Sequence, residues 1–262
     1  MFIHKKYLIN NVNKDTKEYK SSLKKICQLN LRRASKFNIL AILGALECLE
    51  NNQLSGNTGI YVCSEYSAIM SVKKVLEDVS SNNMIMPFDF LNINSNNVSF
   101  YVAQALQSHG KNMLLNSDEL SFEKGLEVAL FDLEINEIED VLIGLVDESL
   151  SNIKDYYKYI SNTISTPSND NSGWLYINQI KEKSLAKIEF IYSFNNLEQM
   201  QEIIEKVTFD VLYTKQKSMD NINKKNLDSI YSIIDFIDSE YNKMIYVKLD
   251  KNNKGYVVSV KK

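Results

Sequence analysis

The sequence predicts an α/β fold in which a mainly parallel sheet carries helices on both faces. Three compact apolar runs are typical of buried strands, at residues 58–66, 111–117 and 139–148. Segments with apolar residues at helical spacing separate these runs, and strands that alternate with helices favour parallel pairing. The chain has 262 residues, of which 44% are hydrophobic, and this is enough for one large domain.

The segments between the predicted strands have the spacing of helices. Residues 17–30 have helical character, and residues 31–52 are apolar on most sides, which predicts a buried helix that ends at Asn51 and Asn52. Residues 67–81 return to the helical period. Two further helices are expected at 98–110, stopped by Gly110, and at 121–135, where Ser121 is a candidate cap.

Residues 86–97 contain Pro87 and many Asn and are expected to form a loop. The second half is less regular, with a polar linker at 161–173, strands at 174–181 and 186–194, and helices at 197–213 and 227–243. A hairpin with its turn at Asn253–Gly255 is expected to close the chain. We expect one compact unit of two parts, 1–160 and 161–262, with no repeat of fixed period in the sequence.

Composition excludes several classes of function. The net charge of −3 gives no basic face for nucleic acid, and the basic tract from Lys5 to Lys25 is expected to be a solvated surface, with phosphate binding as the alternative. No apolar run is long enough for a membrane span, and the first residues lack the apolar core of a signal peptide, so a cytoplasmic protein is expected. The three Cys and two His have no metal-ligand spacing, so we expect no metal and no cofactor.

The turn after residues 111–117 is the first candidate site. Asp118, Glu119 and Glu123 can form an acid/base group or a metal site. Acidic residues at a helix start also complement the helix dipole, and Ser117 or Asp118 can cap the first turn. Both interpretations stay open at this point.

Three other positions carry candidate chemistry. Asp147 and Glu148 follow a predicted parallel strand, at the end where ligands usually bind, and a strand-end pair bonded to nearby backbone is the alternative. His109 precedes a glycine in a predicted loop, which favours a surface histidine. Cys63 ends a buried strand, where a free thiol usually contributes packing.

The order of five segments resembles the N-terminal half of the β-ketoacyl synthases, which are members of the thiolase-like superfamily. The chain is particularly similar to the half-length, chain-length-factor type of synthase-like protein found in aryl polyene and related polyene pathways. The segments are LRRASKFNILAILGALECL, TGIYVCSEYSAI, MPFDFLNINSNNVSFYVAQAL, GKNMLLNSDELSFEKGLEVALFDL and EDVLIGLVDE. The resemblance covers about positions 30–150 and implies a layered α/β/α thiolase-like fold with a shortened second half.

The resemblance also implies that the condensing chemistry is lost. In active ketosynthases the strand before the turn ends in a nucleophilic Cys, and that position falls at Asp118 here, or at Ser117 or Glu119 if the count slips by one. None of these side chains is a thiol, and Asp cannot form and release a thioester. The family also uses two His in its second half, whereas this chain has none after His109.

In this family two subunits pair through the strand before the nucleophile turn. The resemblance therefore implies a partner-strand interface at Asn112, Met113, Leu114, Leu115, Asn116 and Ser117. The implied partner is a catalytic ketosynthase, joined in a heterodimer that an acyl carrier protein serves. Candidate walls of the acyl tunnel are Phe100, Tyr101, Leu120 and Phe122, with core packing as the alternative for each.

Two other functions remain as alternatives to a non-catalytic, chain-length-factor subunit of polyketide or fatty-acid-type elongation. In the first, Ser117 or an acidic group acts alone on an acyl thioester, as a hydrolase or decarboxylase. In the second, the chain is a thiolase-shaped interaction protein that forms a homodimer.

Overall fold

The computed structural model describes residues 1–50, 54, 56–153, 169–216 and 223–262. Its strands form one mixed sheet in the order β3-β2-β4-β5-β1-β6-β10-β9-β7-β8. The strands are β1 (Phe2–Val12), β2 (Thr58–Ser64), β3 (Asn112–Asn116), β4 (Asp140–Asp147), β5 (Asn169–Asn178), β6 (Ala186–Phe194), β7 (Val211–Tyr213), β8 (Lys224–Lys225), β9 (Lys243–Leu249) and β10 (Gly255–Lys261). The helices are α1 (Thr16–Leu23), α2 (Lys36–Leu49), α3 (Ile69–Ser80), α4 (Pro87–Asn92), α5 (Asn97–Leu106), α6 (Ser121–Glu134), α8 (Leu197–Glu205) and α9 (Ser229–Asp238).

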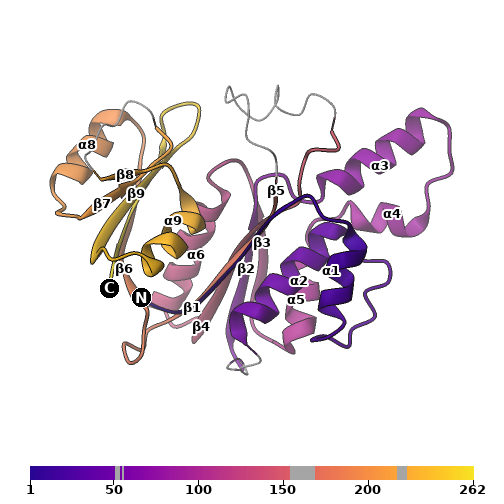
Figure 1. Cartoon of the computed structure of the whole chain (residues 1–262), viewed down its shortest axis with the longest axis horizontal. Helices are drawn as coiled ribbons and strands as arrows, with labels where there is room; N and C mark the ends of the chain where they lie inside the picture. Colours follow the sequence, from indigo (N-terminus) through magenta and orange to yellow (C-terminus); the bar gives the residue numbers. More distant parts are fainter. Residues whose placement is uncertain (51–53, 55, 154–168, 217–222) are drawn as a thin grey trace.

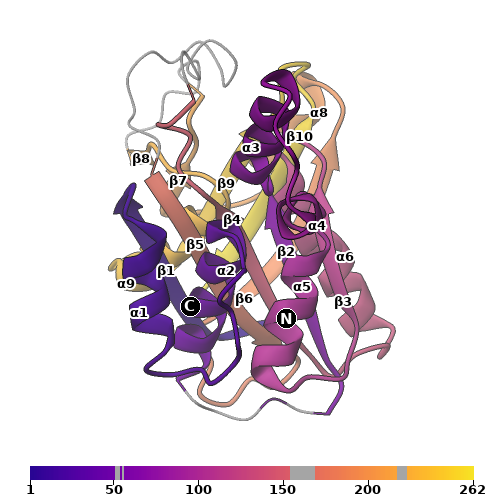
Figure 2. The same cartoon turned by 90° about the vertical axis from the view of Figure 1, so that its right-hand side faces the viewer.

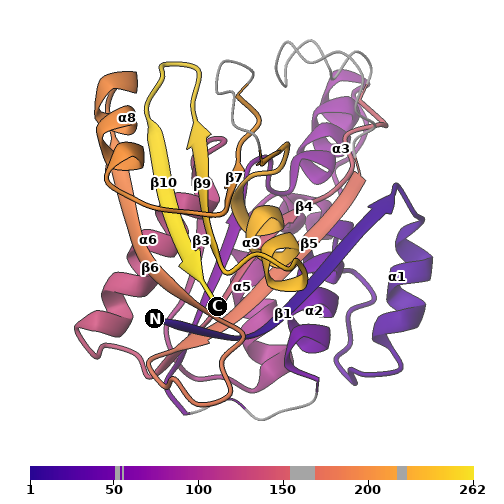
Figure 3. The same ribbon diagram turned by 60° about the vertical axis from the view of Figure 1, so that its left-hand side comes forward.

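The two halves of the sheet repeat one topology. In the first half β1 pairs antiparallel with β5, β5 pairs antiparallel with β4, and β4, β2 and β3 run parallel. In the second half β6, β10, β9, β7 and β8 follow in the same order with the same directions, and Figure 3 shows most of this set beside α8. A short β1–β6 pairing joins the halves at Ile3 and Ala186. The repeat is one of topology, since the sequence shows no periodic repeat.

The molecule has five layers (Figure 1). Helices α1, α2 and α5 pack on the outer face of the first half and share one apolar cluster with it. Helices α6 and α9 lie between the two halves of the sheet. They pack in the central apolar cluster, which contains buried side chains from both halves. Helix α8 covers the outer face of the second half. The layered α/β/α prediction is confirmed in this five-layered form, and fewer helices accompany the second half among the described residues.

Local sequence explains the elements that surround the central layer. All side chains of β2 are buried, as are those of β4 except Asp147, which is why both strands are apolar on both faces. The Ser35 hydroxyl accepts a hydrogen bond from the Asn38 N–H and caps α2. Gly125 lets α6 approach β2, because a Cβ there would lie 2.3 Å from Cys63 Sγ.

The first correction to the sequence prediction concerns the N-terminus. The start of the basic tract is not a solvated surface but part of β1, which lies inside the sheet between β5 and β6. Its lysines reach polar partners with their long side chains: Lys5 Nζ donates to Leu49 O at 2.9 Å and Lys6 Nζ to Asp238 Oδ2 at 2.6 Å. The parallel sheet predicted from 58–148 is correct for β2, β3 and β4, but the complete sheet is mixed.

Other boundaries also differ from the prediction. The loop expected at 86–97 contains the short helix α4, which Pro87 can begin because its missing N–H is unpaired there anyway. The helix expected at 197–213 ends at Glu205, and its apolar end forms β7. Part of the linker expected at 161–173 is the start of β5, while residues 161–168 and the boundary expected between 160 and 161 lie outside the described residues.

The helix predicted at 17–30 ends at Leu23. The helix predicted at 227–243 ends at Asp238, and Lys243 is the first residue of β9. The hairpin is confirmed, with Asn253 in the left-handed region at a φ of 59°. Over the described residues, every helix is too short or too polar to cross a bilayer.

Candidate functional site

Strand β3 is an edge strand, and it leads directly into the candidate turn. It pairs in parallel with β2 and with no other strand among the described residues (Figure 2). Met113 and Leu115 pack against the central cluster, and Leu114 packs against the outer one. The Ile60 N–H donates to Lys111 O at 2.8 Å, so by alternation the backbone groups of Asn112, Leu114 and Asn116 face the free edge.

Hydrogen bonds make the turn a closed structural unit. Ser121 Oγ accepts from the N–H groups of Ser117 and Asp118, at 3.0 and 3.1 Å, and donates to Asp118 O at 2.5 Å. Asp118 Oδ1 accepts from the Leu120 N–H at 2.9 Å. Leu120 occupies the N-cap position without a side-chain bond, so Ser121 is not the N-cap that the sequence suggested. As the first helical residue, it holds the turn through its hydroxyl.

An ion pair occupies the position expected for the nucleophile. Lys124 Nζ lies 2.7 Å from Asp118 Oδ2 and 2.8 Å from Ser117 Oγ. Burial opposes ionisation of Asp118, but the hydrogen bonds from Lys124 and from the Leu120 N–H outweigh it and lower the pKa of this carboxyl. Ser117 Oγ therefore lies between the Lys124 ammonium group and the Asp118 carboxylate, and the lowered pKa of Asp118 makes this carboxylate a poor base for activating the hydroxyl.

Glu119 points to the second half of the chain. Its Oε1 accepts from the N–H of Lys251, in the β9–β10 turn, at 2.9 Å. The three positions considered for the nucleophile are thus all occupied by other groups. Asp118 is an ion-paired carboxylate, Ser117 is a hydroxyl that accepts from Lys124, and Glu119 is a carboxylate that accepts from a backbone N–H. None of the three has the thiol that a thioester intermediate needs.

All the thiols and imidazoles of the chain lie in described segments, and none is at the turn. Cys63 is fully buried on β2, and burial raises the pKa of its thiol well above the ordinary value. Burial likewise raises the pKa of Cys48 to about 12. His109 precedes β3, at the opposite end of that strand from Asp118, and His4 Nε2 lies 2.9 Å from Ile180 O.

A buried charged cluster, which sequence reasoning missed, lies where the first turns of the two central helices meet β9. Lys248 Nζ donates to Ser229 Oγ at 2.9 Å. Burial favours the neutral amine, but the carboxylates of Glu123 and Asp228, with more distant acids, raise the pKa of Lys248. Glu123 is fully buried, and burial raises the pKa of its carboxyl against the opposing effects of the Lys248 charge and the Ser229 hydroxyl.

This cluster explains why the acidic candidates do not form one site. Glu123 turns toward Lys248 in the interior, whereas Asp118 and Glu119 bind groups at the surface of the turn. Ser229 begins α9 at a φ of 50°, a left-handed conformation that is strained for a serine. Only the fold could reveal the cluster, because residues 123, 229 and 248 are far apart in the chain.

Asp147 and Glu148 separate into two environments. Asp147 accepts from Ser64 Oγ at 2.6 Å and from the Tyr66 N–H at 2.9 Å, which ties β4 to the end of β2. Burial raises the pKa of Asp147 to about 6, although the hydrogen bonds from Ser64 and Tyr66 act to lower it. This matches the alternative of a strand-end residue bonded to nearby backbone.

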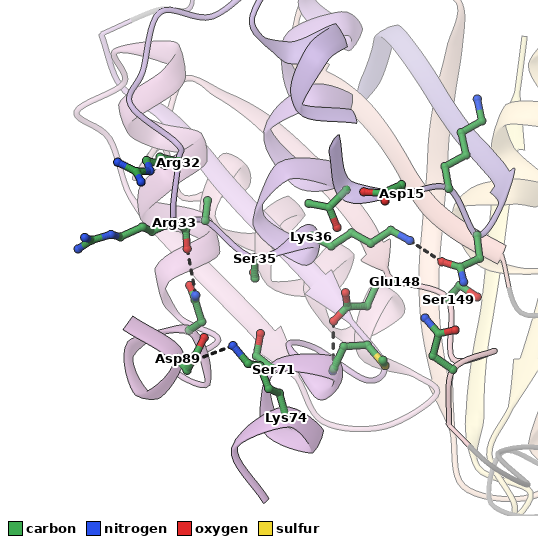
Figure 4. Close-up of a pocket in the computed structure, with 17 residues that line it drawn as sticks. Asp15, Arg32, Arg33, Ser35, Lys36, Ser71, Lys74, Asp89, Glu148 and Ser149 are labelled. Carbon is green, nitrogen blue, oxygen red and sulfur yellow. Dashed lines mark hydrogen bonds and ion pairs between the residues drawn. The ribbon is translucent and has the colours of Figure 1, made fainter. Parts of the chain in front are cut away.

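Glu148 lines a polar cavity of about 550 Å³ together with Arg33, Lys36 and Lys74 (Figure 4). It accepts from the Met70 N–H at 3.2 Å, and burial raises its pKa to about 7. The Lys36 ammonium is already paired with buried Asp170 at 2.8 Å, and Lys74 is paired with Asp89 at 2.6 Å. The cationic walls of this cavity are therefore partly neutralised within the chain.

The structure divides the candidate tunnel residues between two places. Leu120 and Phe122 are buried, and Phe122 belongs to the central core. Phe100 and Tyr101 instead line a second cavity of about 540 Å³, with Phe88, Leu91 and two arginines among its other walls. Phe100 is 58% exposed.

Comparison with known proteins identifies the fold. No protein-family model matches the sequence, and no curated protein matches it. Three solved structures illustrate the likeness. The ishigamide ketosynthase/chain length factor is 9% identical, with a TM-score of 0.75 over 99% of this chain and 98% of that one. A ketosynthase in complex with its chain length factor from Xenorhabdus doucetiae is 14% identical, with a TM-score of 0.62 over 100% of both chains.

The third is a type II polyketide synthase acyl-carrier protein in complex with its ketosynthase. It is 12% identical, with a TM-score of 0.72 over 99% of this chain and 98% of that one. The chain therefore has the thiolase-like fold of the ketosynthases and chain length factors, as the sequence resemblance implied.

Proposed function

We propose that this chain is a non-catalytic subunit of chain-length-factor type, which pairs with a catalytic β-ketoacyl synthase in polyene, polyketide or fatty-acid-type chain elongation. The observation that supports it most directly is the Asp118–Lys124 ion pair, at the turn where the resemblance puts the nucleophile. A lone carboxylate paired with an ammonium group cannot carry an acyl chain as a thioester. The partner supplies the Cys and both His.

The edge position of β3 supports pairing with a second subunit. An unpaired edge presents free N–H and C=O groups, and a second strand satisfies them. The proposed interface runs from Asn112 to Ser117, and it ends at the turn, so both subunits meet beside the site. Two of the similar solved structures, by their descriptions, are complexes of a ketosynthase with a chain length factor or a carrier protein. In our proposal the carrier protein serves the heterodimer.

The hydrolase or decarboxylase alternative has weaker support in the geometry. Ser117 accepts a hydrogen bond from Lys124, and no described His is near it. Turnover of acyl-carrier thioesters by the isolated chain, abolished by Ser117→Ala, would favour that alternative. The homodimer alternative predicts a stable dimer of this chain that is indifferent to any synthase.

Co-purification tests the proposal. The tagged chain is expressed in its own organism, and bound proteins are identified by mass spectrometry. We expect a full-length ketosynthase with an intact Cys and two His, which then forms a 1:1 complex when both proteins are purified and mixed. Wild-type chain that remains separate from every ketosynthase of the organism, at micromolar concentration on gel filtration, would refute the proposal.

A further inference from the structure

The helices α3 and α4 form an arm, residues 69–92, that projects from the body of the molecule (Figures 1 and 2). Val75 is the only buried residue of α3, and α4 buries none. Of the seventeen large hydrophobic residues that are exposed in the described chain, nine lie between Val72 and Phe100. So dense a group of exposed apolar side chains marks an interaction surface.

The apolar side chains of the arm have a defined arrangement. Val72, Leu76 and Val79 recur at the spacing that puts residues on one face of a helix, and Leu76 is 62% exposed. Phe90, 60% exposed, and Leu91 extend the apolar surface onto α4. An exposed apolar stripe on a helix is the element that docks into a groove of another protein.

Polar contacts fix the arm before any partner binds. Lys74 Nζ lies 2.6 Å from Asp89 Oδ2 and joins α3 to α4. The Arg33 guanidinium stacks 3.4 Å from the centre of the Phe88 ring, and Asn92 Nδ2 donates to Arg33 O at 3.0 Å. A preformed surface loses little conformational entropy on binding.

The arm is continuous with the edge of β3. Helix α5 lies between them: Ser99 Oγ on α5 is 3.3 Å from Asn112 Oδ1 on β3. On its other side, Phe100 and Tyr101 of α5 share the second cavity with Phe88 and Leu91 of α4. Helix α5 therefore lies between β3 and the arm, and its Phe100 is exposed there.

The size of a stable interface indicates that a subunit paired through β3 needs a further contact surface. A specific complex buries about 800 Å² on each partner, from about 20–30 residues. Strand β3 has five residues and three of its side chains pack against the apolar clusters of the chain, so strand pairing alone falls well short of this area. We propose that the apolar face of the arm, centred on Leu76 and Phe90, docks on the same ketosynthase subunit that pairs with β3. This inference rests on the proposed function.

The test uses purified full-length chain and the ketosynthase identified by co-purification. Leu76→Glu and Phe90→Glu are each expected to weaken the complex at least tenfold, measured by calorimetry or sedimentation. Ile180→Glu is the matched control, because Ile180 is 58% exposed and lies in the β5–β6 connection, away from the arm. The control should bind within twofold of wild type, and all three variants should keep the wild-type melting temperature.

The outcomes separate this inference from the proposed function. Wild-type affinity in both arm variants, with binding still lost on disruption of β3, would overturn the role of the arm and leave the subunit pairing intact. Dimerisation of the isolated chain that Leu76→Glu abolishes, without effect on the ketosynthase complex, would assign the arm to a second copy and also overturn it. Absence of any wild-type complex would refute the proposed function and the docking together.

Discussion

Asp118 and Lys124 face each other across the start of α6, with Oδ2 and Nζ 2.7 Å apart. This pair stands where the family resemblance puts a nucleophilic thiol, and Ser121 closes the same turn with three hydrogen bonds. The turn is thus stabilised as a structural element. Its chemistry can be tested by restoring the missing group.

Asp118→Cys should give a reactive but non-condensing protein. The variant is made in a Cys27→Ser background, because Cys27 is a free cysteine that is only partly buried. Lys124 lowers the pKa of a neighbouring thiol, so we expect iodoacetamide to label residue 118 at pH 7.5, as seen by mass spectrometry. Cys48 and Cys63 should stay unlabelled because burial raises their thiol pKa. Condensation of acyl and malonyl carriers should remain absent without imidazoles, and its appearance in the isolated variant would contradict loss of the machinery.

The free edge of β3 can be blocked without touching the ladder to β2. The Leu114 N–H faces the edge, so Leu114→Pro removes a donor that only a partner would use. Leu115→Arg adds a charge to the proposed pairing strand. Both variants should lose the ketosynthase complex on gel filtration. Because Leu114 and Leu115 also pack against the apolar clusters, far-UV circular dichroism and thermal unfolding of each variant are measured alongside, and only a variant that keeps its fold counts. A retained complex in both would remove β3 from the interface.

Phe100→Ala should lengthen the product of the reconstituted heterodimer if this residue bounds the acyl chain. Phe100 is exposed in the isolated chain, so the truncation should leave the fold intact. Phe122→Leu tests the interior position with a smaller loss of packing than an alanine. Product length is read by mass spectrometry. Unchanged products from both variants would assign these phenylalanines to packing alone.

Glu148→Gln should stabilise the protein above pH 7. The folded-state pKa of Glu148 is raised to about 7, so the native state binds a proton more tightly than the unfolded chain. Wild-type stability should therefore fall as pH rises from about 4 to about 7, and the variant should lack this component, which is worth about 2–3 kcal/mol. Urea unfolding from pH 4 to 8 measures the difference. If the stability of wild type and of Glu148→Gln changed with pH in the same way, the prediction would be wrong. Glu139→Gln is the control, because Glu139 is exposed and its replacement should leave the pH dependence of stability unchanged.

Gly125→Ala should destabilise the fold because its Cβ would lie 2.3 Å from Cys63 Sγ. Overpacking of this kind costs about 1–3 kcal/mol. Cys63→Ala opens the space, so the double variant should recover part of the loss in denaturant unfolding. Simple additivity of the two changes would show that the cost of Gly125→Ala does not arise from the contact with Cys63.

The residues that determine local structure were sufficient to predict the central part of the fold. The apolar runs of β2 and β4 and the helical spacing between them required buried parallel strands with helices on the faces. The lack of a thiol near 118 and of His beyond 109 is likewise a property of the sequence. These features depend on neighbours within one or two turns, which is why the sequence alone indicates them.

Long-range packing decided the rest. The sequence of β1 looks basic and solvent-exposed, yet the strand lies inside the sheet. Lys5 and Lys6 are accommodated there because their side chains reach Leu49 and Asp238, which belong to distant elements. Glu123, Ser229 and Lys248 meet only because two helices share the space between the halves of the sheet. The repeated strand order and the edge position of β3 arise the same way. Each depends on hydrogen bonds and contacts between residues far apart in the chain, and no local pattern records them.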